Sequence, residues 1–341
     1  MARVAMVFTG GTISMGLDPV AGGNVPALDG AAILARTPGL DTIADIVPID
    51  RGLTPASHFT FEDVLGIGRV VQEALDDTSI AGVVVVQGTD TIEETSFAWD
   101  LVLRSTKPVV VTGAMRAPHE EGFDGPANVR DAVAAAASPE LRDAGVVVTL
   151  AGTLESADDV TKLHTTAFTA FGSPNGGTLG RVVGGRVALE QARGPRRRLD
   201  PVPAAGARVH LLTAGIGSDG SLLDAAIAAG ADGIVVAATG AGNTSPGWLA
   251  AAERAMAGGV VVALASRCPA GPVSTAYAFP GGGATWVRAG AIRVGTLCAI
   301  KARVALALGL GAGISREALA ALLADPVESE TRRRESPEPL G

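Results

Sequence analysis

One short stretch limits the folds open to this chain more than any other. Residues 83–86 are four consecutive valines, and after Gln87 the small or polar residues Gly88–Thr91 follow. A strand of valines has no polar face, so it predicts a parallel strand buried on both sides of a sheet. The residues after it then lie at the carboxyl edge of that sheet, where ligands bind in open α/β folds. We therefore predict Thr89 and Asp90 as site residues.

The rest of the chain repeats this alternation of strand and helix. Strands are expected over 3–8, 42–48, 82–86, 108–112 and 144–150, with helices over 29–37, 61–75, 93–104 and 127–137. A Gly- and Pro-rich segment after the first strand predicts a mobile loop, and a second loop-rich segment covers 157–180. Alternating strands and helices of this length predict βαβ units. The fold class is therefore α/β, with a larger N-terminal doubly wound, Rossmann-like sheet domain.

The length of 341 residues favours more than one domain. Residues 191–208 are rich in Arg, Pro, Gly and Ala and predict a linker, in which the Arg196–Arg198 cluster is solvated. It separates an N-terminal α/β domain over 1–190 from a smaller C-terminal α/β domain over 209–325. Residues 326–341 are dense in Glu, Arg and Pro and predict a disordered tail.

Composition excludes several classes of function. The net charge of −8 disfavours a nucleic-acid partner, and no apolar run reaches the roughly 18 residues that a membrane span needs. The first residues predict a strand rather than a signal peptide, so a cytoplasmic protein is expected. Cys268, Cys298 and four scattered histidines form no metal-binding pattern, and no metal or cofactor is expected.

Four segments carry residues that could perform chemistry. They are a Gly turn at 9–13 that exposes Thr12, the turn 88–91, the segment 111–116 followed by 124–128, and the segment 159–166 with Lys162. Each alone has an ordinary explanation: a cap, a packed strand end or a solvated lysine. The Gly turn is neither a dinucleotide fingerprint nor a P-loop, because both spacings are missing.

The combination of these segments is more informative than any one of them. A threonine hydroxyl is a poor nucleophile at neutral pH and needs a base or a relay to take its proton. A lysine can serve if burial lowers its pKa. Thr89, Lys162 and Asp90 supply the groups of such a relay, which has the logic of a catalytic triad without histidine or cysteine.

Together the four segments resemble the bacterial-type L-asparaginase family, the amidohydrolases that convert asparagine to aspartate and ammonia. The most specific matches are TGGTI at 9–13, QGTDTIEET at 87–95, KPVVVTGAMR at 107–116 and DVTK at 159–162. They occur in the family's order and at similar separations, and the resemblance extends from Val4 to about Leu323.

This resemblance implies a role for each matched residue. Thr12 is the implied nucleophile that forms an acyl-enzyme, and Thr89 and Lys162 belong to the proton relay. Asp90 is expected to bind the α-amino group of the substrate and to orient the relay. Backbone groups at Gly88 and Ala114 are implied in positioning or polarising the substrate.

Three departures from the family pattern leave alternatives open. Ser57 is the candidate for the α-carboxylate of the substrate, but aligning the following residues puts Ala56 at that position. Many members carry a tyrosine in the lid after the nucleophile, whereas Tyr277 is the only tyrosine here, so another residue or water must act. Asn243 is the expected contribution of the C-terminal domain across a dimer interface.

The implied substrate is asparagine, with some activity on glutamine, and the expected assembly is a homodimer or homotetramer. Two other functions are alternatives to this one. An ammonia-supplying amidase subunit of a tRNA-dependent amidotransferase would carry an additional N-terminal domain, whereas Thr12 follows the first strand directly. A non-catalytic amino-acid-binding protein would lack a member of the relay, yet all four catalytic candidates are present.

Overall fold

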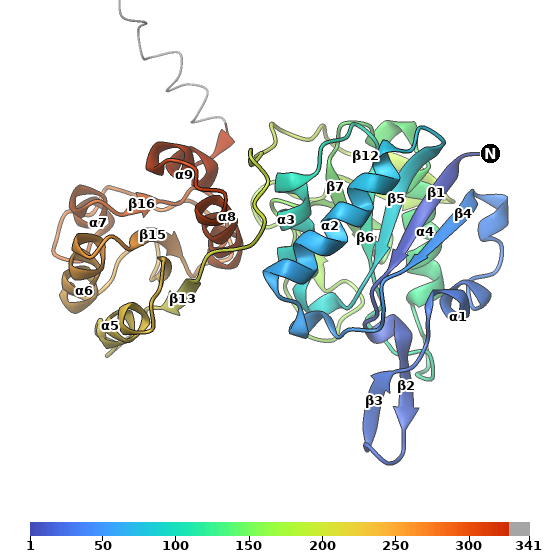
Figure 1. Ribbon diagram of the computed structural model, residues 1–341, viewed down its shortest axis with the longest axis horizontal. Coiled ribbons are helices and arrows are strands. Elements are labelled where there is room, and N and C mark those ends of the chain that lie inside the picture. The colour runs from blue at the N-terminus through green and yellow to red at the C-terminus, as the bar shows by residue number, and fades with distance from the viewer. Residues whose placement is uncertain (327–341) are drawn as a thin grey trace, which may run out of the picture. The chain divides into compact units, whose positions relative to one another are not determined.

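The computed structural model describes residues 1–326 and divides into two compact units, one over Met1–Gly194 and one from Pro195 onward (Figure 1). A large N-terminal sheet domain and a smaller C-terminal α/β domain confirm the predicted fold class. The tail predicted to be disordered lies outside the described residues from position 327 on. Within residues 1–326, no helix is both long and apolar enough to cross a membrane.

The first unit is built on an eight-stranded sheet in the order β12-β11-β8-β7-β6-β5-β1-β4. The parallel strands are β1 (Arg3–Phe8), β4 (Asp45–Asp50), β5 (Ile80–Val86), β6 (Val109–Thr112) and β7 (Val146–Leu150). The strands β8 (Thr153–Ser156), β11 (Gly180–Val183) and β12 (Arg186–Leu189) are antiparallel. The four valines of β5 are fully buried between β1 and β6, as their pattern predicts.

Helices cover both faces of this sheet. On one face α1 (Gly30–Ala35) and α4 (Gly125–Ala136) pack on alternate residues of the parallel strands, and α2 (Phe61–Asp76) and α3 (Ile92–Val102) cover the other (Figure 1). Strand β1 leads to β4 on one side, and the chain then returns to β5 on the other. The carboxyl ends of β1 and β5 are therefore a topological switch point, where α/β folds bind ligands.

Two short hairpins replace segments that the sequence predicts as loops. The strands β2 (Met15–Asp18) and β3 (Gly23–Pro26) form one hairpin, and β9 (Thr161–Lys162) and β10 (Phe171–Gly172) form the other. These strands of two to four residues are rich in Gly and polar residues and show no alternation of apolar and polar positions, so pattern alone does not reveal them. Lys162 thus lies on a strand.

The second unit holds a four-stranded parallel sheet in the order β13-β14-β15-β16. Its strands are β13 (Val209–Thr213), β14 (Gly233–Ala238), β15 (Val261–Ser266) and β16 (Ile292–Arg293). Its helices are α5 (Ser221–Ala228), α6 (Pro246–Ala257), α7 (Gly283–Ala289), α8 (Ala299–Gly311) and α9 (Arg316–Leu323). Helix α7 and strand β16 are short and are not among the elements that the sequence predicts. Trp248 of α6 and Trp286 of α7 are buried in the core of this unit.

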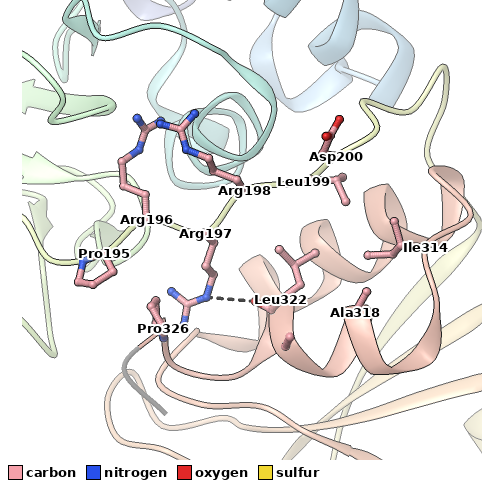
Figure 2. Close-up of a pocket in the computed structure, with 11 residues that line it drawn as sticks. Pro195, Arg196, Arg197, Arg198, Leu199, Asp200, Ile314, Ala318, Leu322 and Pro326 are labelled. Atoms are coloured by element: carbon pink, nitrogen blue, oxygen red, sulfur yellow. Dashed lines mark hydrogen bonds between the residues drawn. The ribbon is translucent and has the colours of Figure 1, made fainter. Parts of the chain in front are cut away.

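The prediction of a solvated arginine cluster is wrong for Arg197. Its guanidinium is buried and donates to the Leu322 and Ala324 carbonyl oxygens at 3.1 and 2.9 Å, and to Asp325 at 3.2 Å. Figure 2 shows Arg197 extending toward Leu322, while Arg196 and Arg198 project the other way. The three arginines are among the residues that line a pocket of about 390 Å³. The terminal carbonyls of a helix lack partners within it, so a cation that caps them is stabilising.

Candidate active site

The loops after β1 and β5 touch through two glycines. Gly11 has a φ of +100°, and a Cβ atom placed on it would lie 2.1 Å from the Gly88 nitrogen. A Cβ atom on Gly88 would in turn lie 3.2 Å from the Gly11 Cα. Only glycine permits this approach, because backbone atoms on both sides cannot move aside. Thr12 and Thr89 each follow one member of the pair, so the contact brings their loops together.

Thr12 opens a single 3₁₀ turn, Thr12–Ser14, and is half-buried. The Ser14 amide donates to the Gly11 carbonyl at 2.8 Å and closes this turn. Among residues 1–326, the Thr12 hydroxyl makes no hydrogen bond that would occupy it. The hydroxyl is therefore available to a ligand at the sheet edge.

The predicted relay residues meet at this edge. Thr89 is buried and begins a 3₁₀ turn, Thr89–Thr91, which is separated from β5 by Gln87 and Gly88. The Lys162 ammonium donates to Thr89 Oγ1 at 2.9 Å and to Asp90 Oδ1 at 3.0 Å. The lysine side chain is 15% exposed, while that of Asp90 is 70% exposed. Lys162 thus joins a buried hydroxyl to a carboxylate that faces solvent, and the Thr89 proton is left to point toward a second acceptor.

The loop after β6 forms the next part of the edge. A Cβ atom on Gly113 would lie 2.5 Å from the Gln87 carbonyl oxygen and 3.2 Å from Thr89 Cγ2, so this glycine packs directly on the relay loop. Ala114, the predicted substrate contact, follows it and is buried. Ala114, which is predicted to position or polarise the substrate, is therefore the next residue after a glycine that packs against Thr89.

Two residues that sequence reasoning did not assign hold this loop in place. The Asp124 carboxylate accepts hydrogen bonds from the Met115 and Arg116 amides at 3.0 Å. Asn128 donates to Asp124 at 2.9 Å and to the Gly113 carbonyl at 3.0 Å. In the sequence, both residues belong to the run Asp-Gly-Pro-Ala-Asn at the start of α4. Such a run predicts only the beginning of a helix and does not reveal that the Asp and Asn side chains bind a neighbouring loop.

The alternatives Ala56 and Ser57 occupy different surroundings. They lie in a 3₁₀ turn, Ala56–His58, beside the relay loop. Ala56 is buried, its Cβ lies 3.0 Å from a Cβ atom placed on Gly88, and its carbonyl accepts from the Thr91 hydroxyl at 3.1 Å. Ser57 is exposed. Both lie near the site, and the assignment of the α-carboxylate to one of them stays a prediction.

The remaining predicted residue, Asn243, belongs to the second unit. Its backbone bridges to Thr239, whose hydroxyl donates to the Asn243 carbonyl at 2.7 Å. Its side-chain Oδ1 is buried and, within the described chain, has no hydrogen-bond partner. Its role in binding stays a prediction.

His164, close to Lys162 in sequence, has a structural role. Its Nδ1 accepts hydrogen bonds from the Thr166 and Ala167 amides, both at 3.0 Å, and so shapes the loop between β9 and β10. In the part of the chain that the structure describes, His, Cys, Asp and Glu side chains form no group of three that could hold a metal ion.

Comparison with known proteins places this site in context. Residues 3–194 match the family model "Asparaginase, N-terminal", and residues 208–323 match "Glutaminase/Asparaginase C-terminal domain". The chain is 36% identical to a probable L-asparaginase of Deinococcus radiodurans, covering 93% of this chain and 95% of that protein. It is 31% identical to a probable periplasmic L-asparaginase of Haemophilus influenzae, covering 91% and 89%. The crystal structure of a probable cytoplasmic L-asparaginase from Campylobacter jejuni superposes with a TM-score of 0.84 at 29% identity, covering 95% of this chain and all of that one.

Proposed function

This chain belongs to the asparaginase family, and from that premise we propose that it hydrolyses the side-chain amide of L-asparagine to L-aspartate and ammonia, with Thr12 as nucleophile. The observation that carries the assignment of roles is the lysine bridge, in which Lys162 donates to both Thr89 Oγ1 and Asp90 Oδ1. The Thr89 hydroxyl accepts from this lysine, and its loop contacts the loop that carries the Thr12 hydroxyl. This arrangement supports acyl transfer by a threonine, which needs a relay to take its proton.

In the first half of the reaction Lys162 acts as the neutral amine, because an ammonium cannot accept a proton. Thr12 Oγ1 attacks the amide carbon, its proton passes to the Thr89 hydroxyl, and the Thr89 proton passes to the Lys162 amine. The relay then delivers a proton to the amide nitrogen, the C–N bond breaks and ammonia leaves. An ester between Thr12 and the side chain of the substrate remains. Backbone N–H groups in the contacting Gly11 and Gly88 loops are assigned the stabilisation of the negative charge on the carbonyl oxygen.

In the second half, water attacks this ester. The relay takes one proton from the water and returns one to Thr12 Oγ1, so that the C–O bond breaks and aspartate is released. In each half, Thr89 and Lys162 first accept a proton and then return one. A lysine with a hydroxyl partner can therefore serve as both base and acid in this proposal, without histidine.

Binding of the amino-acid end is assigned to groups around the relay. The Asp90 carboxylate is mostly exposed and suits the α-amino group of the substrate. Ser57 or the backbone of Ala56 is assigned to the α-carboxylate, with Gly88 and Ala114 beside them, and Asn243 is assigned as the contribution of another copy of the chain. Asparagine and glutamine differ by one methylene, which is worth about 1–3 kcal/mol in a pocket, so activity on both is expected.

Ammonia release from asparagine by the wild type, Thr12→Ala, Thr89→Val and Lys162→Met tests this function, with Thr106→Ala as an exposed threonine control. Hydroxylamine added during turnover should capture the acyl group as a hydroxamate, and mass spectrometry should locate the ester on Thr12. If the wild type releases no ammonia from asparagine, glutamine or their D forms, the hydrolase assignment is wrong. An ester found on Thr89 would exchange the two threonine roles.

We also propose that the protein is a cytoplasmic homodimer or homotetramer. The Campylobacter jejuni structure is described as cytoplasmic, whereas the Haemophilus influenzae relative is described as periplasmic, so cell fractionation is the direct test. Light scattering should give a mass two or four times that of one chain, and a monomer that retains full activity would contradict this assembly.

A further inference from the structure

Glu155 is a buried carboxylate that the proposed mechanism does not use. It lies on β8 and is 2% exposed, while its neighbour Leu154 points into the core on the opposite face of the strand. A buried carboxylate costs free energy unless hydrogen bonds offset the loss of water. The hydrogen-bond partners of Glu155 therefore indicate its role.

Both oxygens of Glu155 hold one short segment. Ser173 donates its hydroxyl to Oε2 at 2.6 Å, and Thr178 donates to Oε1 at 3.2 Å. Asp159 binds the same segment from another direction, since it accepts from the Asn175 and Gly176 amides at 3.0 and 2.6 Å. The turn 173–178 is thus fixed by two carboxylates.

This turn continues directly from the hairpin that carries Lys162. Ser173 follows β10, and β10 pairs with β9 so that Phe171 lies opposite Lys162. Beyond the two paired residues, the Leu163 amide donates to the Ala170 carbonyl at 2.7 Å. A ladder this short does not fix its own register, and a slip of one residue moves a side chain by about 3.3 Å and to the other face. Such a slip would separate Lys162 from Thr89.

We propose that Glu155 is a positioning residue for Lys162. By accepting hydrogen bonds from Ser173 and Thr178, it fixes the β9–β10 hairpin so that the ammonium group lies on Thr89 and Asp90. The inference rests on the proposed function, in which Lys162 takes part in proton transfer with Thr89. Glu155 acts through the hairpin and does not touch the substrate.

Steady-state kinetics on asparagine test this role. Glu155→Met keeps the size of the side chain and removes both acceptors, and we expect kcat to fall about 10- to 100-fold with KM within about threefold, since small misplacements of catalytic groups have effects of this size. Glu155→Gln can still accept from one hydroxyl and donate to the other, so it should retain kcat within about threefold. Leu154→Ala is the matched control, because it should lower the melting temperature and leave kcat per folded molecule unchanged.

A double-mutant cycle separates positioning from general stability. If Glu155 acts only through Lys162, then Glu155→Met should lower kcat no further in a Lys162→Met background. If Glu155→Met does not fold, Ser173→Ala combined with Thr178→Val replaces it in the cycle. Wild-type kcat in the folded variant, or equal losses in both backgrounds, would overturn the positioning role. A wild type without amidase activity would instead overturn the proposed function, so the two failures are distinguishable.

Discussion

Replacing Gly11 with alanine tests whether the ends of β1 and β5 must touch. The new Cβ would lie 2.1 Å from the Gly88 nitrogen and 2.2 Å from its Cα, and neither backbone atom can move aside as a flexible side chain would. Gly11 also has a φ of +100° with a ψ of −173°, a conformation that costs other residues about 1–3 kcal/mol. Overpacking adds about 1–3 kcal/mol. Gly11→Ala should therefore lower the free energy of unfolding by about 2–6 kcal/mol.

Gly52→Ala provides the matched control for this substitution. Gly52 has a similar φ of +94°, but a Cβ atom there would meet nothing within 4 Å. It should show the conformational cost alone, about 1–3 kcal/mol, with little change in kcat. Urea denaturation gives both free energies, and ammonia release gives kcat. Equal stabilities for the two variants, together with wild-type kcat for Gly11→Ala, would refute the idea that this contact aligns Thr12 with the relay.

Three further substitutions probe other parts of the first unit. Arg193→Met leaves the buried Asp100 carboxylate without its 2.6 Å partner and should cost about 3–5 kcal/mol by urea denaturation; a loss below 1 kcal/mol would contradict this. Asp124→Ala removes the acceptor of the Met115 and Arg116 amides in the loop that carries Ala114, so it should raise KM for asparagine several-fold. An unchanged KM would show that this loop keeps its conformation without Asp124. Burial raises the pKa of Glu155 above its usual 4.5, so its stabilising contribution is complete below that pH and is lost as pH rises through the folded pKa. The melting temperature of the wild type relative to Glu155→Gln should therefore fall from pH 4 to pH 7, and a constant difference would argue against this.

The parts of the fold that follow from local signals were predictable. The valine run could only be a doubly buried strand, and the residues after it had to lie at a carboxyl edge of the sheet. Thr89, Asp90 and Lys162 meet as the sequence indicates. Their grouping was inferred from the chemistry that a threonine hydroxyl needs, together with the family resemblance, rather than from any local pattern.

Long-range side-chain contacts were not predictable. Arg197 lies among Arg, Pro and Gly residues that suggest a solvated linker, yet it is buried because carbonyl oxygens some 125 positions later accept its protons. Glu155 occupies a strand position that pattern rules assign to solvent, and its partners Ser173 and Thr178 lie 18 and 23 residues away. No short window of sequence contains both members of these pairs.

The segment after Thr12 contains few side chains that could take a proton from the proposed nucleophile. Residues 15–29 contain two titratable side chains, Asp18 and Asp29, and no tyrosine. Asp18 accepts from the Val20 and Ala21 amides at 2.7 and 3.1 Å, and Asp29 accepts from the Ala32 amide at 2.8 Å. Both carboxylates therefore shape the backbone of their own loops, one in the turn of the β2–β3 hairpin and one at the start of α1. In the proposed chemistry the base for Thr12 is therefore assigned to the relay, and the placement of Lys162 by its own hairpin becomes its structural requirement.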